Sequence, residues 1–292
     1  MNKFKGLGVA MVTPFNDDLS IDFDALKKLT NYLIDNKVDY LVVMGTTGES
    51  VTLSNAEKQA VLECVQSENK GRLPIVFGAG SNNTAQLIES FKSIDFSGID
   101  AILSVAPYYN KPTQEGIYRH FEAVADASPV PVVLYNVPGR TSSNILPGTV
   151  LRLAEHNNIV AVKEASGSFD QFMEIIGNKP DGFLCISGDD GFAMPFIAAG
   201  GDGLISVVGN AYPLLTSNMI HKSLEDNNSE ARELHYRLLP IIPKLFAEGN
   251  PAGIKEVMKM MGICNNNVRL PLVCASEGLK FELSEQFERL KG

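Results

Sequence analysis

The sequence predicts an α/β protein built as a (β/α)8 TIM barrel with a C-terminal helical extension. Eight short apolar runs, rich in β-branched residues, recur over the first 210 residues, and a helical pattern follows each of them. The runs are nearly continuous rather than alternating, which is typical of parallel strands covered on both faces. Eight consecutive strand–helix units fit a closed barrel better than a doubly wound sheet of five or six strands.

The eight candidate strands are separated by segments long enough to hold a helix. In chain order they span residues 6–14, 38–45, 74–80, 99–107, 130–136, 159–165, 182–188 and 203–210.

Helical patterns with start signals lie between these runs. In the first of them, four apolar side chains share one helical face: Phe23, Leu26, Leu29 and Leu33. Two serines followed three positions later by Glu or Gln predict capping boxes, namely Ser54 with Glu57 and Ser168 with Gln171.

We expect the barrel to span residues 1–226 and a helical segment, residues 227–292, to pack on it. The stretches SEARELHYRLLPIIPKLF and PAGIKEVMKMMG are helical in pattern and exceed what a minimal barrel needs. No low-complexity linker separates the two parts. Such a segment usually covers a surface or builds a subunit contact, and nothing in it suggests chemistry of its own.

The composition argues against several classes of function. The 292 residues carry a net charge of −9, which disfavours binding to nucleic acid. No apolar run reaches the roughly 18 residues that cross a bilayer, and the N-terminal residues lack signal-peptide features. We therefore expect no membrane partner and a cytoplasmic location. The four cysteines and four histidines show neither Cys-x-x-Cys nor His-x-x-x-His spacing, so no disulfide framework and no metal site are predicted.

Unusual polar residues gather where the predicted strands end. The motifs are GTTGES (45–50), PYYN (107–110), YNVPGRT (135–141), KEASG (163–167) and SGDDG (187–191). In a parallel barrel these strand ends meet at one mouth, where catalytic groups sit. The sequence therefore predicts a site at this end.

Lys163 follows four apolar residues, Ile159 to Val162, at the end of one run. Burial of a lysine in an apolar site favours the neutral amine, which is a nucleophile. In the alternative interpretation, Lys163 marks the point where the strand surfaces and pairs with Glu164 in water.

Each of the other motifs also has a structural alternative. GTTGES is an ordinary glycine turn or a loop whose hydroxyls and backbone N–H groups hold a carboxylate. Tyr135 is a core aromatic or a proton shuttle, and Arg140 is a solvated charge or a carboxylate clamp. The two acids of GDDG fit a helix N-terminus better than a metal site. Jointly, the amine, phenol, hydroxyl loop and arginine supply the parts of an amine-catalysed carbonyl reaction.

With PYYNKPTQEG, NPAGIK (250–255) and RLPL (269–272), these motifs resemble the dihydrodipicolinate synthase family over essentially the whole chain. The wider superfamily, which includes N-acetylneuraminate lyase and other pyruvate-dependent aldolases, shares the glycine–hydroxyl loop, the YN-x-P turn and the lysine. Arg140 and the double tyrosine of PYYN favour the synthase. The alternatives are another pyruvate-dependent aldolase, such as a keto-sugar-acid aldolase, and a binding protein that keeps the pocket without the chemistry.

The resemblance implies a lyase that condenses pyruvate with L-aspartate-4-semialdehyde, in the diaminopimelate route to lysine, without a metal or organic cofactor. Lys163 would form the Schiff base with pyruvate, whose carboxylate would be held by Thr46 and Thr47. Tyr135, Thr46 and Tyr109 would form a proton relay, with Tyr109 reaching in from a neighbouring subunit.

The resemblance also implies the second half of the pocket and the assembly. Arg140 would bind the carboxylate of the semialdehyde, and the backbone of Gly188 and Ile205 would line the pocket. The family's usual assembly implies a homotetramer, a dimer of dimers, with a dimer as the fallback.

Feedback-inhibited relatives bind L-lysine at a dimer interface. The matching positions are Ser50, Asn55, Lys58, Asn82, Gln86 and Tyr108. Such relatives typically carry His and Glu where this chain has Lys58 and Gln86. An added cation and a lost carboxylate both disfavour a cationic effector. We therefore expect L-lysine to inhibit this protein weakly or not at all.

Overall fold

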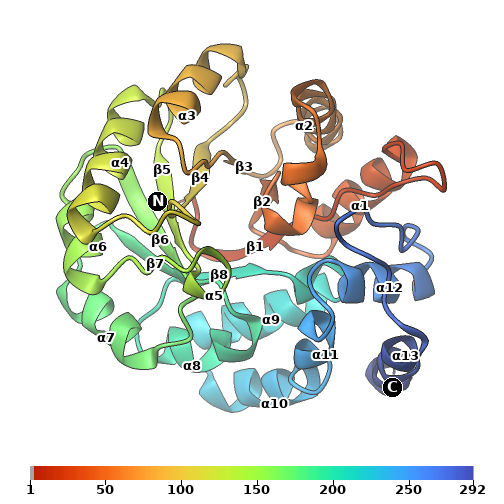
Figure 1. Cartoon of the computed structure of the whole chain (residues 1–292). Helices are drawn as coiled ribbons and strands as arrows, with labels where there is room; N and C mark the ends of the chain where they lie inside the picture. The colour runs from red at the N-terminus through yellow and green to blue at the C-terminus, as the bar shows by residue number, and fades with distance from the viewer. Residues whose placement is uncertain (1–2, 292) are drawn as a thin grey trace.

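The computed structural model describes residues 3–291, and its centre is a closed barrel of eight parallel strands in sequential order (Figure 1). The strands are β1 Gly6–Ala10, β2 Tyr40–Val43, β3 Ile75–Gly78, β4 Ala101–Val105, β5 Val132–Asn136, β6 Ile159–Glu164, β7 Leu184–Ser187 and β8 Gly203–Ser206. All eight predicted strands and the barrel are confirmed. Most predicted runs extend past the observed strands, because their last residues have already left the sheet and entered the loops of the mouth.

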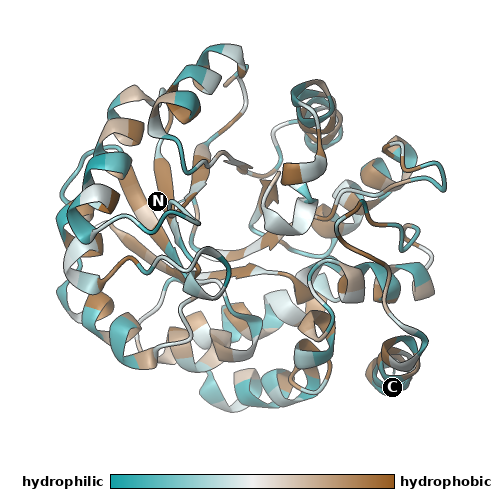
Figure 2. Ribbon diagram, in the orientation of Figure 1, coloured by the Kyte–Doolittle hydropathy of each residue, from teal (hydrophilic) through white to brown (hydrophobic). Residues whose placement is uncertain are grey.

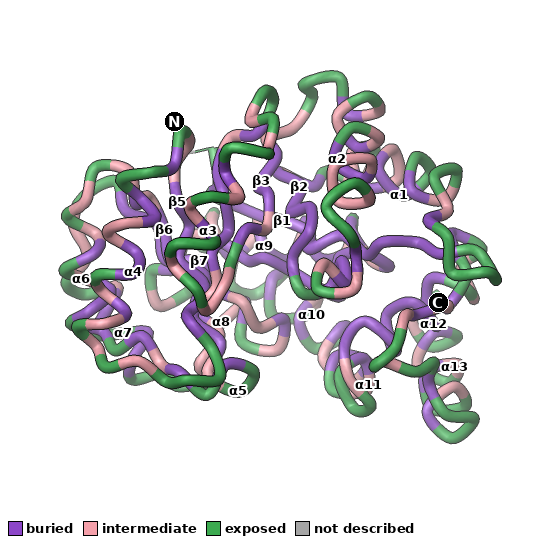
Figure 3. Tube along the Cα trace, turned by 45° about the horizontal axis from the view of Figure 1, so that its top comes forward, coloured by how far each residue is buried: buried purple, intermediate pink, exposed green. Residues whose placement is uncertain are grey.

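Strands of this barrel are apolar throughout because both of their faces are buried. On β2, Tyr40 and Val42 face the barrel interior, while Leu41 and Val43 belong to the core beneath the helices. Figure 2 shows the strands in hydrophobic colours, and Figure 3 shows them buried inside a rim of exposed loops. This double burial explains the continuous apolar runs of the sequence.

Aromatic packing fills the N-terminal end of the barrel. A Cβ added at Gly8 would lie 2.2 Å from the Tyr40 ring, so only glycine leaves room for this side chain. Phe4 packs edge-on against Tyr40, with the ring centroids 5.8 Å apart. The interior is therefore a packed core at this end, and the polar residues lie at the opposite end.

A ring of helices surrounds the barrel, and a helix follows every strand (Figure 1). The ring contains α1 Phe23–Asp35, α2 Asn55–Asn69, α3 Thr84–Ser90, α4 Gln114–Ala127, α5 Pro138–Thr141, α6 Pro147–Ala154, α7 Phe169–Asn178, α8 Ala193–Ala198 and α9 Pro213–Leu224. Short 3-10 helices are η1 Thr46–Gly48, η2 Ser50–Thr52, η3 Phe91–Ser93, η4 Asp190–Phe192 and η5 Val208–Asn210. Of the apolar face predicted for α1, Leu26, Leu29 and Leu33 are buried, but Phe23 at the first turn is 38% exposed.

One predicted capping box is confirmed and the other is wrong in part. Ser54 Oγ accepts from the N–H of Glu57 at 3.2 Å, and the Glu57 carboxylate accepts from the N–H of Ser54 at 2.8 Å. Ser168 Oγ likewise accepts from the N–H of Gln171, at 3.2 Å. The Gln171 side chain, however, donates to the buried carboxylate of Glu164 at 3.2 Å instead of returning to the cap. A buried charge needs hydrogen-bond donors, and this need outweighs the second half of the box.

The residues after the barrel form four helices: α10 Asn228–Leu238, α11 Ile242–Phe246, α12 Ala252–Met260 and α13 Glu277–Lys291. α10 packs on α8 and α9, and the contacts of α11 and α12 include η4 and η5 at the mouth (Figure 1). Residues 252–258 of α12 are all buried. Because this segment is packed on the barrel, we propose the division into a barrel, residues 1–226, and an appended segment, residues 227–292. Among the residues that the structure describes, no helix is both long and apolar enough to cross a bilayer.

Candidate active site

Lys163 lies inside the barrel rather than at its surface. It is 6% exposed, and its Nζ lies 4.2 Å from the centroid of the Tyr135 ring. The two residues are direct partners in the pairing of β5 with β6. An ammonium above an aromatic face is attracted by the ring electrons, so the phenol also holds the lysine in place. The structure thus brings together the predicted nucleophile and the predicted proton shuttle.

An irregularity in strand pairing creates this arrangement. Val132 pairs with Ile159, but the next residue, Val133, pairs with Ala161, so Val160 is an extra residue in β6. If the pairing had continued from Val132 without this irregularity, Tyr135 would lie opposite Val162. Since neighbouring residues on a strand point to opposite faces, the extra residue decides that Lys163 points into the barrel beside Tyr135.

Glu164 points away from Lys163, toward the helices. Its carboxylate is 4% exposed and accepts hydrogen bonds from the N–H of Ser166 at 2.6 Å, Asn136 Nδ2 at 3.0 Å and Gln171 Nε2 at 3.2 Å. The alternative in which Lys163 surfaces and pairs with Glu164 in water is therefore wrong. Successive strand residues face opposite sides, so the two charges are separated by the sheet.

Asn136 and Glu164 are strand partners one step beyond Tyr135 and Lys163. Asn136 also donates to Asn144 Oδ1 at 2.8 Å and accepts from the N–H of Ile145 at 2.9 Å. This buried polar cluster fixes the ends of β5 and β6 against the loop before α6. Sequence reasoning missed its role, although Asn136 and Glu164 both lie within the quoted motifs.

Gly188 packs closely against the side chain of Lys163, just after the end of β7. A Cβ added there would lie 2.9 Å from Cε of Lys163 and 2.8 Å from Cβ of Ala165. Its N–H donates to the carbonyl of Glu164 at 2.7 Å. Any larger residue would have to displace the lysine chain or the backbone beside it.

A buried carboxylate ties the ends of β7 and β8 together. Asp190 accepts from Ser206 Oγ at 2.5 Å and from the N–H of Val207 at 3.1 Å, next to Ile205, which is 1% exposed. Burial raises the pKa of Asp190 to about 6. Its neighbour Asp189 caps η4 by accepting from the N–H of Gly191 at 2.9 Å, as expected for an acid at a helix N-terminus.

The loop after β2, residues 45–50, is called the hydroxyl loop here, and hydrogen bonds from two other segments of the chain hold it in place. Thr46 is exposed, whereas Thr47 is buried and its Oγ1 accepts from Asn250 Nδ2 at 2.9 Å. Thr13 Oγ1 donates to the carbonyl of Gly48 at 2.7 Å. The structure thus gives the two predicted carboxylate-binding threonines different surroundings.

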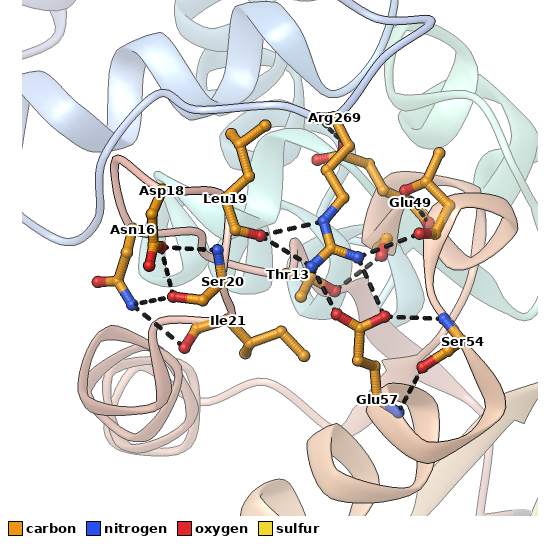
Figure 4. Close-up of polar contacts among 12 residues, drawn as sticks. Thr13, Asn16, Asp18, Leu19, Ser20, Ile21, Glu49, Ser54, Glu57 and Arg269 are labelled. Atoms are coloured by element: carbon orange, nitrogen blue, oxygen red, sulfur yellow. Dashed lines mark hydrogen bonds and ion pairs between the residues drawn. The ribbon is translucent and has the colours of Figure 1, made fainter.

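The loop also contains a buried ion pair that sequence reasoning missed. Glu49 lies directly after Gly48, and its carboxylate contacts Nζ of Lys255 at 2.5 Å, with both side chains fully buried. Arg269 donates its backbone N–H to the other carboxylate oxygen at 2.9 Å, and its guanidinium holds Glu57 on the next helix (Figure 4). Both partners were within the quoted NPAGIK and RLPL motifs, but no local pattern indicates that they contact this loop.

Tyr109 and Arg140 lie on the surface. Tyr109 is 88% exposed at a positive φ of 75°, and its N–H donates to the carbonyl of Thr141 at 3.4 Å. The guanidinium of Arg140 makes no hydrogen bond or ion pair with any other residue of the described range 3–291. Within one chain, the structure therefore brings the two loops together but does not bring Tyr109 to Lys163.

The six predicted regulatory residues occupy consecutive surface elements. Ser50 is in η2, Asn55 and Lys58 are in α2, Gln86 is in α3, Asn82 precedes it, and Tyr108 follows β4. None of the six is buried, and Asn82 Nδ2 donates to the carbonyl of Tyr108 at 3.3 Å. Over residues 3–291, no cluster of three or more His, Cys, Asp or Glu side chains has an arrangement that could hold a metal ion.

Comparison with known proteins identifies the family. A model described as the "Dihydrodipicolinate synthetase family" matches residues 3–290. The chain belongs to the dihydrodipicolinate synthetase family. A relative in this family from Flavobacterium psychrophilum, named 4-hydroxy-tetrahydrodipicolinate synthase, is 54% identical over 284 residues, which cover 97% of each chain.

Solved structures of dihydrodipicolinate synthases share the whole fold. The Bacillus anthracis enzyme DapA-2 is 42% identical, with a TM-score of 0.94 and 99% of each chain covered. A chloride-inhibited Acinetobacter baumannii enzyme, solved with pyruvate, is 36% identical, with a TM-score of 0.95 and coverage of 98% of this chain and 99% of that one. The resemblance that the motifs indicated is confirmed.

Gly188→Ala tests the geometry around the amine. The added Cβ would collide with Lys163 and Ala165, so we expect kcat/KM in a synthase assay to fall by about tenfold to a hundredfold, as displacement of a reacting group does. Gly177→Ala is the matched control, because nothing lies within 4 Å of a Cβ added there. Unchanged kinetics of Gly188→Ala, measured alongside this control, would show that Gly188 does not confine the amine.

Proposed function

We propose that this protein condenses pyruvate with L-aspartate-4-semialdehyde to 4-hydroxy-tetrahydrodipicolinate, through a Schiff base on Lys163. The observation that carries this proposal is a contrast between two buried lysines. Lys255 is neutralised by Glu49, whereas Lys163 forms no ion pair within residues 3–291 and contacts the Tyr135 ring. A buried amine without a countercharge is suited to act as a nucleophile. The synthase name of the 54% identical relative supports the same activity.

The reaction follows from the chemistry of an amine and a keto acid. Neutral Nζ of Lys163 attacks the keto carbon of pyruvate, and loss of water with uptake of one proton gives a protonated imine. The imine withdraws electrons from the neighbouring methyl group, which loses a proton to give an enamine. The enamine carbon then attacks the aldehyde carbon of the semialdehyde, whose oxygen takes up a proton and becomes a hydroxyl group, while the imine is restored. Attack by the amino group of the bound semialdehyde unit on the imine carbon closes the ring and releases Lys163 as a free amine.

Several of these steps move protons, and Tyr135 is placed to carry them. Its ring contacts the reacting amine, and a positioned phenol can pass a proton to and from a substrate. We assign Thr46 and Tyr109 to the same relay. Since Tyr109 is 88% exposed in one chain, we assign its phenol to the site of a neighbouring subunit.

The two substrates each carry a carboxylate, and the mouth offers two groups to hold them. We assign the pyruvate carboxylate to Thr46 and Thr47, whose loop ends β2. We assign the carboxylate of the semialdehyde to Arg140, because its exposed guanidinium has no partner among residues 3–291 and can bind in a bidentate manner. Gly188 and Ile205 complete the wall beside the amine.

We further propose a homotetramer, a dimer of dimers, in the cytoplasm. Tyr109 and Val51 are 88% and 89% exposed, and large apolar side chains on loops beside a site suggest a subunit contact. A dimer would be the smaller assembly that still supplies Tyr109. All four cysteines are free thiols, which suits a reducing compartment.

Other pyruvate-dependent aldolases on this scaffold, such as N-acetylneuraminate lyase, are not favoured. The matched relatives carry the synthase name, and Arg140 suits a substrate with a second carboxylate.

Reductive trapping tests the Schiff base. Treatment with borohydride in the presence of pyruvate should attach one pyruvyl group per chain, and peptide mapping should place it on Lys163. Lys163→Met should remain unlabelled, while Lys259→Met, an exposed lysine on α12, should label as the wild type does. Unlabelled wild-type protein would favour a binding protein without this chemistry.

Mixing two inactive variants tests whether Tyr109 acts across an interface. Tyr109→Phe and Lys163→Ala should each lose most activity, but a hybrid dimer has one site with both groups intact. After denaturation and refolding of an equal mixture, half of the dimers are hybrids with one intact site of two, so about a quarter of the activity should return. Should Tyr109 act within its own chain, no activity returns. Sedimentation velocity of the wild type distinguishes tetramer from dimer.

L-Lysine should inhibit weakly or not at all, because Lys58 adds a cation and Gln86 lacks a carboxylate at the predicted effector positions. A steady-state assay over increasing L-lysine measures this directly. The double change Lys58→His with Gln86→Glu should increase sensitivity. Strong inhibition of the wild type by sub-millimolar L-lysine would contradict the charge argument.

A further inference from the structure

The hydroxyl loop after β2 is held by residues that come from the far end of the chain. Glu49 and Lys255 are 206 residues apart, and Asn250, which binds Thr47, comes from the same short stretch as Lys255. Glu49 adopts a left-handed conformation, with φ of 53°, at the junction of η1 and η2. Glu49 is thus a turning point of the loop, and Lys255 of α12 binds its side chain.

Two hydrogen bonds and one aromatic contact fix the position of the Lys255 side chain. Its Nζ donates to Glu49 at 2.5 Å and to the carbonyl of Asn267 at 2.8 Å, and it lies 4.2 Å from the centroid of the Phe15 ring. Both Glu49 oxygens are occupied, one by Lys255 and the other by the N–H of Arg269 at 2.9 Å. Burial lowers the pKa of Lys255, and the carboxylate of Glu49 opposes that shift.

Stability alone does not explain such a pair. Two charges removed from water lose hydration, so a buried ion pair is often no more stabilising than apolar side chains of similar volume. The pair fixes the position of Glu49 relative to Lys255, because each buried charge must stay close to the other. That geometry is imposed two residues from Thr47, at the loop assigned to the pyruvate carboxylate.

We propose that Glu49 and Lys255 are positioning residues that hold the hydroxyl loop in the geometry required to bind the carboxylate of pyruvate. This inference rests on the role proposed above for Thr46 and Thr47. The appended C-terminal segment thereby becomes part of the machinery for one substrate. Among residues 3–291, the polar partners of Glu49 and Lys255 do not include the loop that carries Arg140, so binding of the second substrate is left to a separate element.

The variants are Glu49→Gln, Lys255→Met and the double substitution, with Lys259→Met as control, since Lys259 is an exposed lysine one turn along α12. Lys255→Met alone leaves a buried carboxylate unpaired and should lower Tm most. Glu49→Gln conserves volume and the acceptor for Arg269, and the buried Lys255 can then lose its proton, so this variant should fold. The double variant removes both charges and should recover most of the lost Tm.

The deciding measurement is the KM for each substrate. We expect the double variant and Glu49→Gln to raise the KM for pyruvate about tenfold or more, with the KM for the semialdehyde little changed, as loss of ground-state binding to one substrate does. Because the same loop carries Thr46 of the proposed relay, kcat should fall as well. The control should match the wild type. A pyruvate KM that recovers together with Tm in the double variant, or that stays at the wild-type value in Glu49→Gln, would overturn the proposal. If the proposed active site itself is wrong, the wild type should instead form no borohydride adduct on Lys163.

Discussion

The pairing register between β5 and β6 is the constraint on which the site depends. Because strand side chains alternate between faces, a shift of one residue would send Lys163 among the helices and bring Glu164 into the barrel. The extra residue Val160 sets this register. The hydrogen bond from Asn136 to Glu164, one step further along, keeps it in place. One backbone irregularity, secured by a buried carboxylate, therefore decides which of the two charged side chains, Lys163 or Glu164, faces the barrel interior.

Buried charges in this protein fall into two kinds. Glu164, Asp190 and the pair Glu49 with Lys255 all have hydrogen-bond donors or countercharges that compensate for lost hydration. Within residues 3–291, Lys163 forms no ion pair and lies over the face of the Tyr135 ring. This difference is the reason for which we propose Lys163 as the reacting amine. The same contrast distinguishes two buried lysines, Lys163 and Lys255.

At the mouth of the barrel, some loops are held by buried contacts and others are exposed. The amine of Lys163 stands on a strand, and two parts of the mouth are cross-linked: Asp190 joins the ends of β7 and β8, and Lys255 of α12 holds the loop after β2. The loops that carry Tyr109 and Arg140 remain exposed. The cross-linked parts of the mouth thus have fixed geometry, while Tyr109 and Arg140 are exposed, as the roles we propose for them require.

The sequence by itself determined the barrel, its eight strands, the mouth where the motifs gather and the family, because these follow from local periodicity and from motifs that stay intact in one stretch of chain. It also gave the cap at Ser54. Tertiary structure alone decided the inward direction of Lys163, since one unpaired residue in β6 leaves no trace in an apolar run. Tertiary structure also decided that the Gln171 side chain donates to Glu164 instead of completing the cap of its own helix. It likewise brought Glu49 into contact with Lys255, 206 residues away in the chain. Partners chosen by burial and distance in space have no fixed spacing in the chain, so no local pattern could have predicted them.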